Sequence, residues 1–383
     1  MTDDVKEDWW KIDKKFVKYG SEVNWLRKLL SKLGKYAAGV WIYYTIVYSM
    51  YISQILSSLD GTIKSWVLLY LIGVAISFAG AWLHQKIARS NVNIEERYEK
   101  VIKRIFLGVF ALMIFALGAG IISSYYFLEV SDYEFENEKI QESVKLVQLS
   151  DIHNAEFGKE NQRLLKKLKE CEPDLIFITG DLINSDENEI SPMLDLVKKL
   201  REIAPIYFSL GNHEIEYEKR TGIDLTEKLE KAGAKVLEEK FVDVTVKGQK
   251  FRIGGLYTVY IPEDYEVHEW DNAKEQAEFL KEMEDTERYK ILLSHIPNTW
   301  MYYDTAATFD LDLIFTGHAH GGQAILPFVG GLYAPDMGYF PGRLSGVYEK
   351  GHTQVILSRG LGSNTEVIPR FNNIPEIVEV ELK

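Results

Sequence analysis

Residues 311–323 of this chain read LDLIFTGHAHGGQ, an apolar run that leads into two histidines. A short apolar run that ends at glycine indicates a buried strand. We therefore expect a strand that aims His318 and His320 at one point in space. Imidazole is the commonest protein metal ligand near neutral pH and suits zinc-, iron-, nickel- and manganese-class ions. Taken alone, the pair fits an ordinary turn equally well, so the interpretation depends on the rest of the chain.

Strand-like runs recur through the second part of the chain, and five of the eight histidines follow such runs. Helical stretches near 160–170 and 188–203 separate the first three runs. Alternating strands and helices indicate a sheet covered by helices. Residues 173–181, PDLIFITGD, resemble 311–318, LDLIFTGH, so we expect two similar halves whose strand ends face one site. The predicted strands are 146–149, 175–179, 206–210, 251–254, 290–293 and 311–316.

Metal-ligand residue types follow five of these strands. In open α/β sheets, sites collect beyond the carboxyl ends of the strands, and neighbouring glycines let the chain turn sharply there. Two carboxylates, one amide and four imidazoles are too many ligands for one ion. They suit two ions about 3.5–4 Å apart, the geometry of hydrolytic two-metal sites. The set is Asp151, His153, Asp181, Asn212, His295, His318 and His320.

This set, in this order, resembles the calcineurin-like metallophosphoesterases. The pattern of that family is D-x-H, G-D, G-N-H-[DE], H and G-H-x-H, and residues 144–383 carry every part of it. The resemblance implies a four-layer α/β-β/α sandwich and a metal-dependent phosphoesterase. The segments SRGLG at 358–362 and NIPEI at 373–377 are similar to the membrane-anchored bacterial branch of the family.

The resemblance also implies a role for each residue. Asp151, His153 and His320 would hold one ion, and Asn212, His295 and His318 the other. Asp181 would bridge both ions, which we expect to be divalent or trivalent ions of the Mn, Fe, Zn or Ni class. His213 would lie beside the metals and protonate the leaving oxygen of a phosphomono- or phosphodiester. Asp181 and His213 are therefore the predicted catalytic residues.

The first 128 residues differ from the rest in hydropathy and charge. Residues 1–35 contain an amphipathic helical stripe of Trp and Leu opposite Lys and Arg, which favours a helix in a membrane interface over one packed on the protein. Uncharged runs at about 36–59, 65–83 and 105–128 approach or exceed the ~20 residues that cross a bilayer. We predict three transmembrane helices over 36–128, then a linker at 129–143 and the catalytic domain at 144–383.

The loops predict the orientation of these helices. Nine Lys/Arg precede the first predicted span, one lies in 60–64 and six lie in 84–104. Because positive residues remain cytoplasmic, we expect a multi-pass protein of the cell membrane with a cytoplasmic amino terminus and an extracellular catalytic domain.

Charge and composition narrow the function. Residues 1–128 hold 16 Lys+Arg against 10 Asp+Glu, a net +6, and residues 129–383 hold 28 against 47, a net −19. So acidic a domain makes nucleic acid an unlikely partner. We predict a membrane-tethered hydrolase of a phosphoester, lipid-linked or from the wall; the apolar stretch 325–335 would serve such a substrate or else pack internally. The alternative is a membrane sensor or binding protein whose metal site is structural or silent.

Overall fold

The computed structural model describes residues 115, 118–257, 273–303, 305–326, 330–363 and 370–383. The predicted interfacial segment 1–35, the first two predicted spans and residues 105–114 of the third lie outside this part of the chain. Residues 118–126, near the end of the third predicted span, are helical. Within the described ranges, no helix combines the length and the apolar character needed to cross a bilayer.

The first sheet has six strands in the order β1-β16-β2-β3-β4-β5. Four of them run parallel: β2 (Val144–Leu149), β3 (Leu175–Thr179), β4 (Ile206–Ser209) and β5 (Ala234–Val236). β16 (Glu376–Leu382) pairs antiparallel with β2, and β1 (Glu129–Phe135) pairs parallel with β16. The helices that follow its strands are α5 (Gln162–Cys171), α6 (Ser191–Arg201), α7 (Asn212–Thr221) and α8 (Leu225–Ala232).

The second sheet has six strands in the order β14-β15-β9-β8-β7-β6. β7 (Gln249–Gly255), β8 (Tyr289–Leu293), β9 (Leu313–Thr316) and β15 (Thr353–Leu357) run parallel, and β6 (Lys240–Val246) and β14 (Gly346–Lys350) pair antiparallel at the edges. Its helices are α9 (Ala273–Glu284), α10 (Asn298–Met301) and α11 (Thr305–Thr308).

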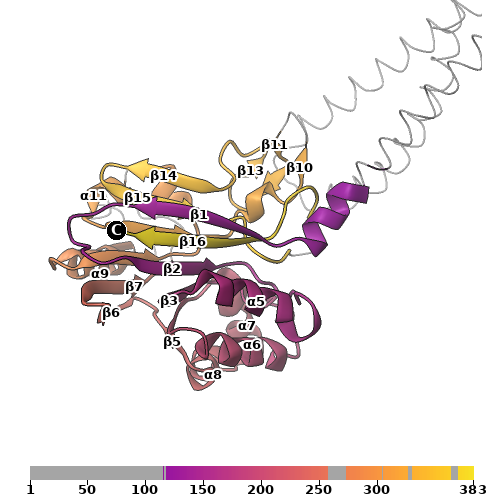
Figure 1. Ribbon diagram of the computed structural model, residues 1–383, viewed down its shortest axis with the longest axis horizontal. Helices are drawn as coiled ribbons and strands as arrows, with labels where there is room; N and C mark the ends of the chain where they lie inside the picture. The colour runs from indigo at the N-terminus through magenta and orange to yellow at the C-terminus, as the bar shows by residue number, and fades with distance from the viewer. Residues whose placement is uncertain (1–114, 116–117, 258–272, 304, 327–329, 364–369) are drawn as a thin grey trace, which may run out of the picture. The chain divides into compact units, whose positions relative to one another are not determined.

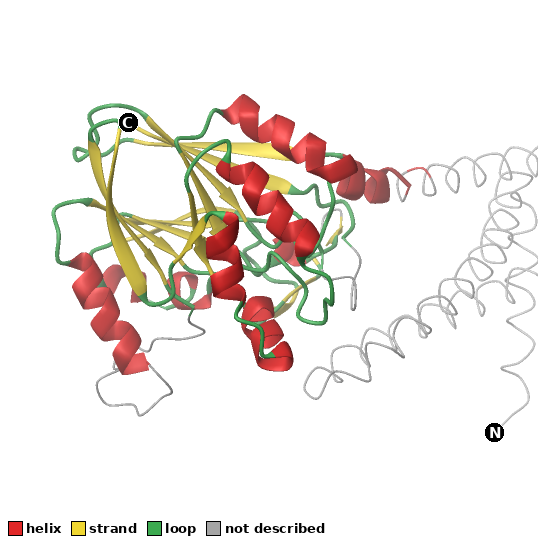
Figure 2. Ribbon diagram, turned by 90° about the horizontal axis from the view of Figure 1, so that it is seen from below, coloured by secondary structure: helices red, strands yellow, loops and turns green. Residues whose placement is uncertain are grey.

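The two sheets pack face to face, with helices on the outer faces (Figures 1 and 2). One apolar core lies between the sheets, where the rings of Phe177 in β3 and Phe315 in β9 are 5.2 Å apart. A second core joins the first sheet to α5, α6 and α8, and a third joins the second sheet to α9, α10 and α11. Central strands buried on both faces read as continuous apolar runs, which is why the sequence revealed them. The predicted α/β sandwich is confirmed.

The predicted linker at 129–143 requires a correction, because its first half is strand β1. The sequence EVSDYEF is too charged to stand out as a strand. Its Tyr133 and Phe135 nevertheless pack against the core between the sheets, while Val130 packs against the helix-covered face. β1 is thus an edge strand of the domain.

Two small hairpins follow the histidine motif. η3 (His320–Gly322) leads into β10 (Ile325–Leu326), which pairs with β11 (Gly330–Gly331), and β12 (Tyr333–Ala334) pairs with β13 (Gly338–Tyr339). Ala334 is buried in the core beneath α9 to α11 and Met337 packs against that core, whereas Phe340 is 45% exposed. The apolar stretch is therefore partly packed and partly exposed.

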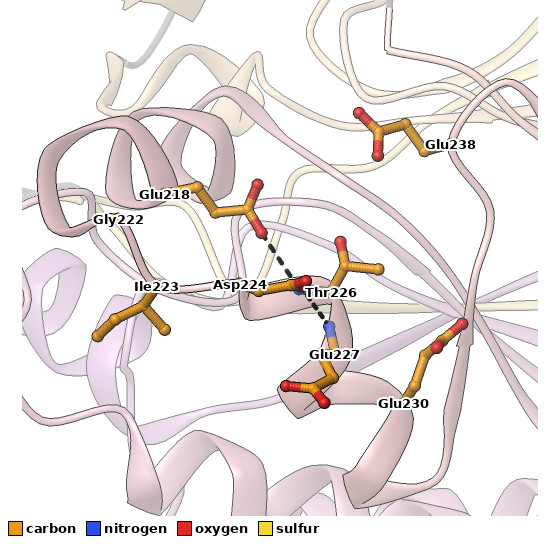
Figure 3. Close-up of a pocket in the computed structure, with 8 residues that line it drawn as sticks. All are labelled: Glu218, Gly222, Ile223, Asp224, Thr226, Glu227, Glu230 and Glu238. Atoms are coloured by element: carbon orange, nitrogen blue, oxygen red, sulfur yellow. Dashed lines mark hydrogen bonds between the residues drawn. The ribbon is translucent and has the colours of Figure 1, made fainter.

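A surface hollow of about 550 Å³ lies where α7 leads into α8 (Figure 3). Glu218 accepts hydrogen bonds from the backbone N–H groups of Leu225 and Thr226, and Asp224 caps α8 by accepting from Glu227 N at 2.7 Å. Carboxylates at a helix start satisfy N–H groups that lack intrahelical partners. Two of the five carboxylates that line this hollow thus serve helix capping. Its carboxylates belong to Glu218, Asp224, Glu227, Glu230 and Glu238.

Candidate metal centre

Every predicted ligand lies at the carboxyl end of a strand, and the strands come from both sheets. Five of these residues, Asp151, His153, Asp181, His318 and His320, have φ between 48° and 66°. This left-handed region costs non-glycine residues on the order of 1–3 kcal/mol each, and such strain collects at functional sites. Sharp turns after the strands therefore direct these side chains back toward one another.

The turn after β9 requires glycine at position 317, because the backbone there packs closely against Asp151. A Cβ on Gly317 would lie 2.5 Å from Asp151 Oδ2, closer than two such atoms can approach. The backbone N–H of His318 uses this space to donate to Asp151 Oδ1 at 2.9 Å. The motif after β9 is thereby fastened to the motif after β2.

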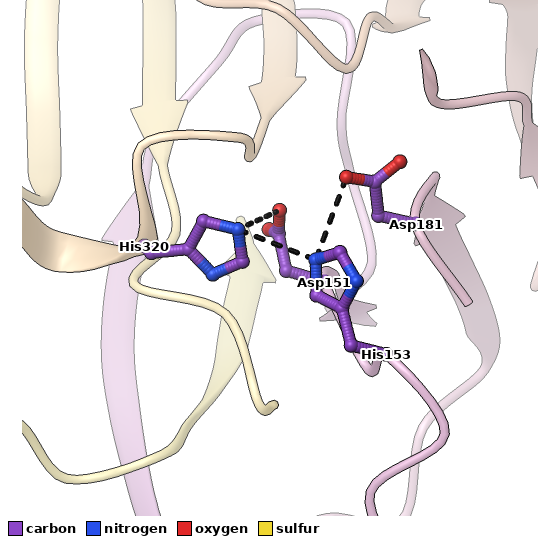
Figure 4. A group of neighbouring side chains, drawn as sticks. All are labelled: Asp151, His153, Asp181 and His320. Atoms are coloured by element: carbon purple, nitrogen blue, oxygen red, sulfur yellow. Dashed lines mark hydrogen bonds and ion pairs between the residues drawn. The ribbon is translucent and has the colours of Figure 1, made fainter. Parts of the chain in front are cut away.

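The first cluster consists of Asp151, His153, Asp181 and His320, whose ligand atoms all lie within 4.8 Å of one another (Figure 4). His153 Nε2 is 3.2 Å from His320 Nε2 and 3.5 Å from Asp181 Oδ2, and His320 Nε2 is 3.6 Å from Asp151 Oδ1. All four side chains are buried. Buried imidazole and carboxylate groups whose ligand atoms converge in this way can hold a metal ion.

The second cluster consists of Asp181, His295 and His318. His295 Nε2 lies 3.1 Å from Asp181 Oδ2 and 3.2 Å from His318 Nδ1. Asp181 is the member that both clusters share. The structure thus joins the two groups through one buried carboxylate.

The hydrogen bonds on the far side of the imidazoles leave a nitrogen of each ring free to face the clusters. His153 Nδ1 lies 2.9 Å from Asn184 Oδ1, and His295 Nδ1 lies 2.7 Å from the carbonyl oxygen of Thr179. Both oxygens can only accept, so each Nδ1 carries the proton and each Nε2 presents a lone pair. Such outer partners fix the tautomer and orientation of metal-binding histidines.

Asn212 and His213 are the first two residues of α7, directly after β4. Asn212 Oδ1 is buried and accepts no hydrogen bond from the described residues; an oxygen in that state fits a cation ligand. His213 Nδ1 accepts from the backbone N–H of Ser185 at 2.9 Å, so the proton of the neutral ring is on Nε2, 4.0 Å from Asp181 Oδ2. His213 therefore adjoins the clusters with a donor facing them.

Charge within the site also suits cations. Burial acts to raise the pKa of Asp181, but the imidazoles of His295, His153 and His213 outweigh it and hold this pKa well below its usual range. Burial lowers the pKa of His295, but the carboxylates of Asp181 and Asp151 prevail and raise it to about 10, so a metal ion that binds His295 Nε2 would have to displace a proton from it. The buried carboxylates thus favour positive charge here. Burial lowers the pKa of His320 to about 3, which keeps it neutral as a metal ligand must be.

Glu214 is a buried residue of the site for which the sequence predicted no role. Its carboxylate accepts from the backbone N–H groups of Asp181, Leu182 and Gly211, each at 2.8 Å. Burial, followed by the charge of Asp181, raises the pKa of Glu214 to about 7. Glu214 ties the turn after β3 to the turn after β4. Its place directly after His213 in the G-N-H-[DE] motif is the sequence signal that points to a role in the site.

A buried set of carboxylates and imidazoles at the strand ends of an α/β sandwich is typical of a metal-binding protein. Residues 144–322 match the model of the family described as calcineurin-like phosphoesterase. Over these residues the chain is similar to that family, and the match together with the buried ligand clusters supports a metal-dependent phosphoric ester hydrolase.

Curated relatives have matching names. An uncharacterized metallophosphoesterase of Campylobacter jejuni is 28% identical over 277 residues, 70% of this chain and 67% of the relative. Phosphodiesterase YaeI of Escherichia coli is 26% identical over 216 residues, 56% of this chain and 72% of the relative. A Danio rerio transmembrane protein with metallophosphoesterase domain is 33% identical over 113 residues, 28% of this chain and 26% of the relative.

Proposed function

We propose that this protein is a membrane-tethered phosphoesterase that uses two metal ions and acts on the extracellular side of the membrane. The observation that carries the catalytic part is Asp181, which is shared by two clusters of ligand-type side chains. A shared carboxylate suits two ions about 3.5–4 Å apart. Asp151, His153 and His320 would complete one site, and Asn212, His295 and His318 the other.

The two ions would supply Lewis acidity and a water of lowered pKa. The residues of the chain would position the two ions and donate a proton to the leaving oxygen. The shared Asp181 fixes the spacing of the sites, and its Oδ1 accepts from the backbone N–H of His213 at 3.0 Å. His213 then presents Nε2–H as the donor for the leaving oxygen of the ester, because its Nδ1 is held by Ser185.

Hydrolysis of p-nitrophenyl phosphate and of bis(p-nitrophenyl) phosphate by the purified full-length chain, with Mn²⁺ added, tests this function. We expect turnover of at least one ester that a chelator abolishes. His352→Ala is a matched control, because His352 is an exposed histidine that pairs with Asp310 away from the clusters. If no divalent metal supports turnover, the metal site is silent, and a sensor or binding protein becomes the better interpretation.

Three observations support a substrate held at the membrane surface. Ile121, Ile122, Tyr126 and Phe127, at the end of the third predicted span, are each more than half exposed. The side-chain Nδ2 of Asn373 donates to the carbonyl oxygen of His320 at 2.7 Å, and its backbone N–H donates to Ser124 Oγ. This contact keeps the helix end near the metal clusters. The names of the Danio rerio and Escherichia coli relatives favour a membrane protein and a phosphodiester.

Phe340 offers a test of the lipid-linked substrate. It is exposed beside the β12–β13 hairpin and has φ of 55°, so Phe340→Asn removes apolar surface without adding backbone strain. We expect weaker hydrolysis of a phospholipid ester in vesicles, with turnover of the soluble nitrophenyl ester retained. Equal losses on both substrates, accompanied by a lower melting temperature, would assign Phe340 to packing.

A further inference from the structure

We propose that Asp336 is a positioning residue for the metal ligand His318, held in place by the hairpin between β12 and β13. This proposal rests on the two-metal function above. Asp336 Oδ2 lies 2.8 Å from His318 Nε2, and the carboxylate is about half exposed whereas the imidazole is buried. The contact joins the surface hairpin to the interior of the site.

The orientation of His318 explains why this contact matters. Its Nδ1 faces His295 Nε2 at 3.2 Å, on the side of the second cluster, and its Nε2 faces Asp336. An acceptor at Nε2 holds the proton there and leaves the lone pair on Nδ1. Asp336 thus does for His318 what Asn184 and Thr179 do for His153 and His295. Of these three partners it alone is an ionised side chain, and a carboxylate also raises the basicity of the ligand.

The hairpin is built to present this carboxylate. The carbonyl oxygen of Asp336 accepts from Asn298 Nδ2 at 3.2 Å, and Met337 N donates to the carbonyl of Ala334 at 3.2 Å. Ala334 is fully buried, so the hairpin is anchored in the core of the second sheet. Asp336 has φ of 57°, a conformation that Asp and Asn tolerate better than most residues.

Two substitutions separate a positioning role from a structural one. Asp336→Gly removes the carboxylate and suits the positive φ, so the hairpin should keep its fold. Asp336→Asn also suits that φ and keeps an oxygen that can accept from His318, but it lacks the charge. His352→Ala breaks a comparable histidine–aspartate pair on the surface, 2.9 Å in length, and serves as the control.

The primary measurement is Mn²⁺ binding to the purified full-length chain by titration calorimetry, with metal content determined after gel filtration. We expect Asp336→Gly to weaken one of two Mn²⁺ sites by about 10–100-fold, the range for loss of such a partner. Asp336→Asn should weaken Mn²⁺ binding less than Asp336→Gly does, and His352→Ala should leave the affinity for Mn²⁺ unchanged. Hydrolysis by Asp336→Gly at limiting Mn²⁺ should fall, and excess Mn²⁺ should restore it.

Three results would overturn the proposal, and they can be told apart. Wild-type affinity of Asp336→Gly for both Mn²⁺ ions, in a chain whose wild type binds two, overturns the role of Asp336 and leaves the proposed function intact. A wild type that binds no pair of Mn²⁺, Fe²⁺, Zn²⁺ or Ni²⁺ ions overturns both the role of Asp336 and the proposed function. A lower melting temperature of Asp336→Gly with unchanged Mn²⁺ affinity also overturns the role of Asp336, because the hairpin contact would then be structural.

Discussion

At the scale of single residues, the site is organised by side chains that serve two neighbours at once. Asp181 Oδ2 approaches His295, His153 and His213, while its Oδ1 accepts from a backbone N–H. The left-handed conformation of Asp181 is retained because Glu214 holds its backbone N–H. Strain of this kind persists only where the surrounding contacts determine it.

Asp181→Ala should therefore remove both metal sites together. We expect no measurable phosphoesterase activity and a metal content well below two ions per chain, measured by elemental analysis of the purified protein. Asp186 is an exposed residue in the same loop, so Asp186→Ala is the matched control. It should retain both the phosphoesterase activity and the metal content of the wild type. Two bound ions in Asp181→Ala would show that this carboxylate does not bridge them.

His213→Ala should affect chemistry and leave metal content unchanged, because His213 faces the clusters only as a donor. General acid–base groups contribute roughly 10²–10⁴-fold in rate. The loss should be large with an alkyl phosphoester and small with a nitrophenyl ester, whose leaving group needs no proton. Comparing kcat for the two substrates measures this difference. Equal losses on both would exclude His213 as the proton donor.

At the scale of elements, the strand ends and their turns were predictable, and the parts that hold them were not. β2, β3, β4, β8 and β9 are short apolar runs with a ligand-type residue just beyond, so their local sequence reveals both strand and site. β1 was missed because its alternating apolar residues sit among charges. Asp336 carries no local signal, and Asn373 stands out only as the start of the segment 373–377 without a role, since each acts on a histidine 18 or 53 positions away.

The turn after β9 depends on such a distant residue. Asn373 is fully buried, and its Nδ2 donates to the carbonyl oxygens of His320 and Gln323 at 2.7 and 3.2 Å. Asn373→Ala leaves these acceptors without their donor, at a cost of about 1–3 kcal/mol for a buried group. We expect a lower melting temperature and weaker Mn²⁺ binding.

Thermal unfolding with and without Mn²⁺ measures both effects of Asn373→Ala. Asn372→Gly is the adjacent control, because Asn372 is exposed and has φ of 50°, which glycine accepts. If Asn373→Ala melts at the temperature of the wild type and binds Mn²⁺ as tightly, Asn373 does not support the turn.

At the scale of the whole molecule, the charge divides the chain at the end of the third predicted span. The basic first 128 residues and the acidic remainder, +6 against −19, match a protein whose positive loops remain in the cytoplasm. The orientation is thus a prediction from charge. It can be tested by labelling cysteines introduced at chosen positions, because the single native cysteine of the chain is buried and should not react.

Cys171 is buried, and burial, followed by a hydrogen bond with Glu379, raises the pKa of its thiol to about 12. Because the thiolate is the reactive form, a membrane-impermeant maleimide should leave the wild type unlabelled on intact cells. Lys166 in α5 is 78% exposed, so Lys166→Cys supplies an accessible thiol in the catalytic domain. Arg97→Cys places a thiol in the loop predicted to be cytoplasmic.

We expect Lys166→Cys to be labelled on intact cells and Arg97→Cys only after permeabilisation. The physical reason is that six Lys/Arg in 84–104 and nine before the first predicted span would hold those segments inside, so the three predicted spans would place residues 129–383 outside. The reverse labelling pattern would put the metal clusters in the cytoplasm. The phosphoesters of the inner membrane surface and the cytosol, and not those outside the cell, would then be the candidate substrates.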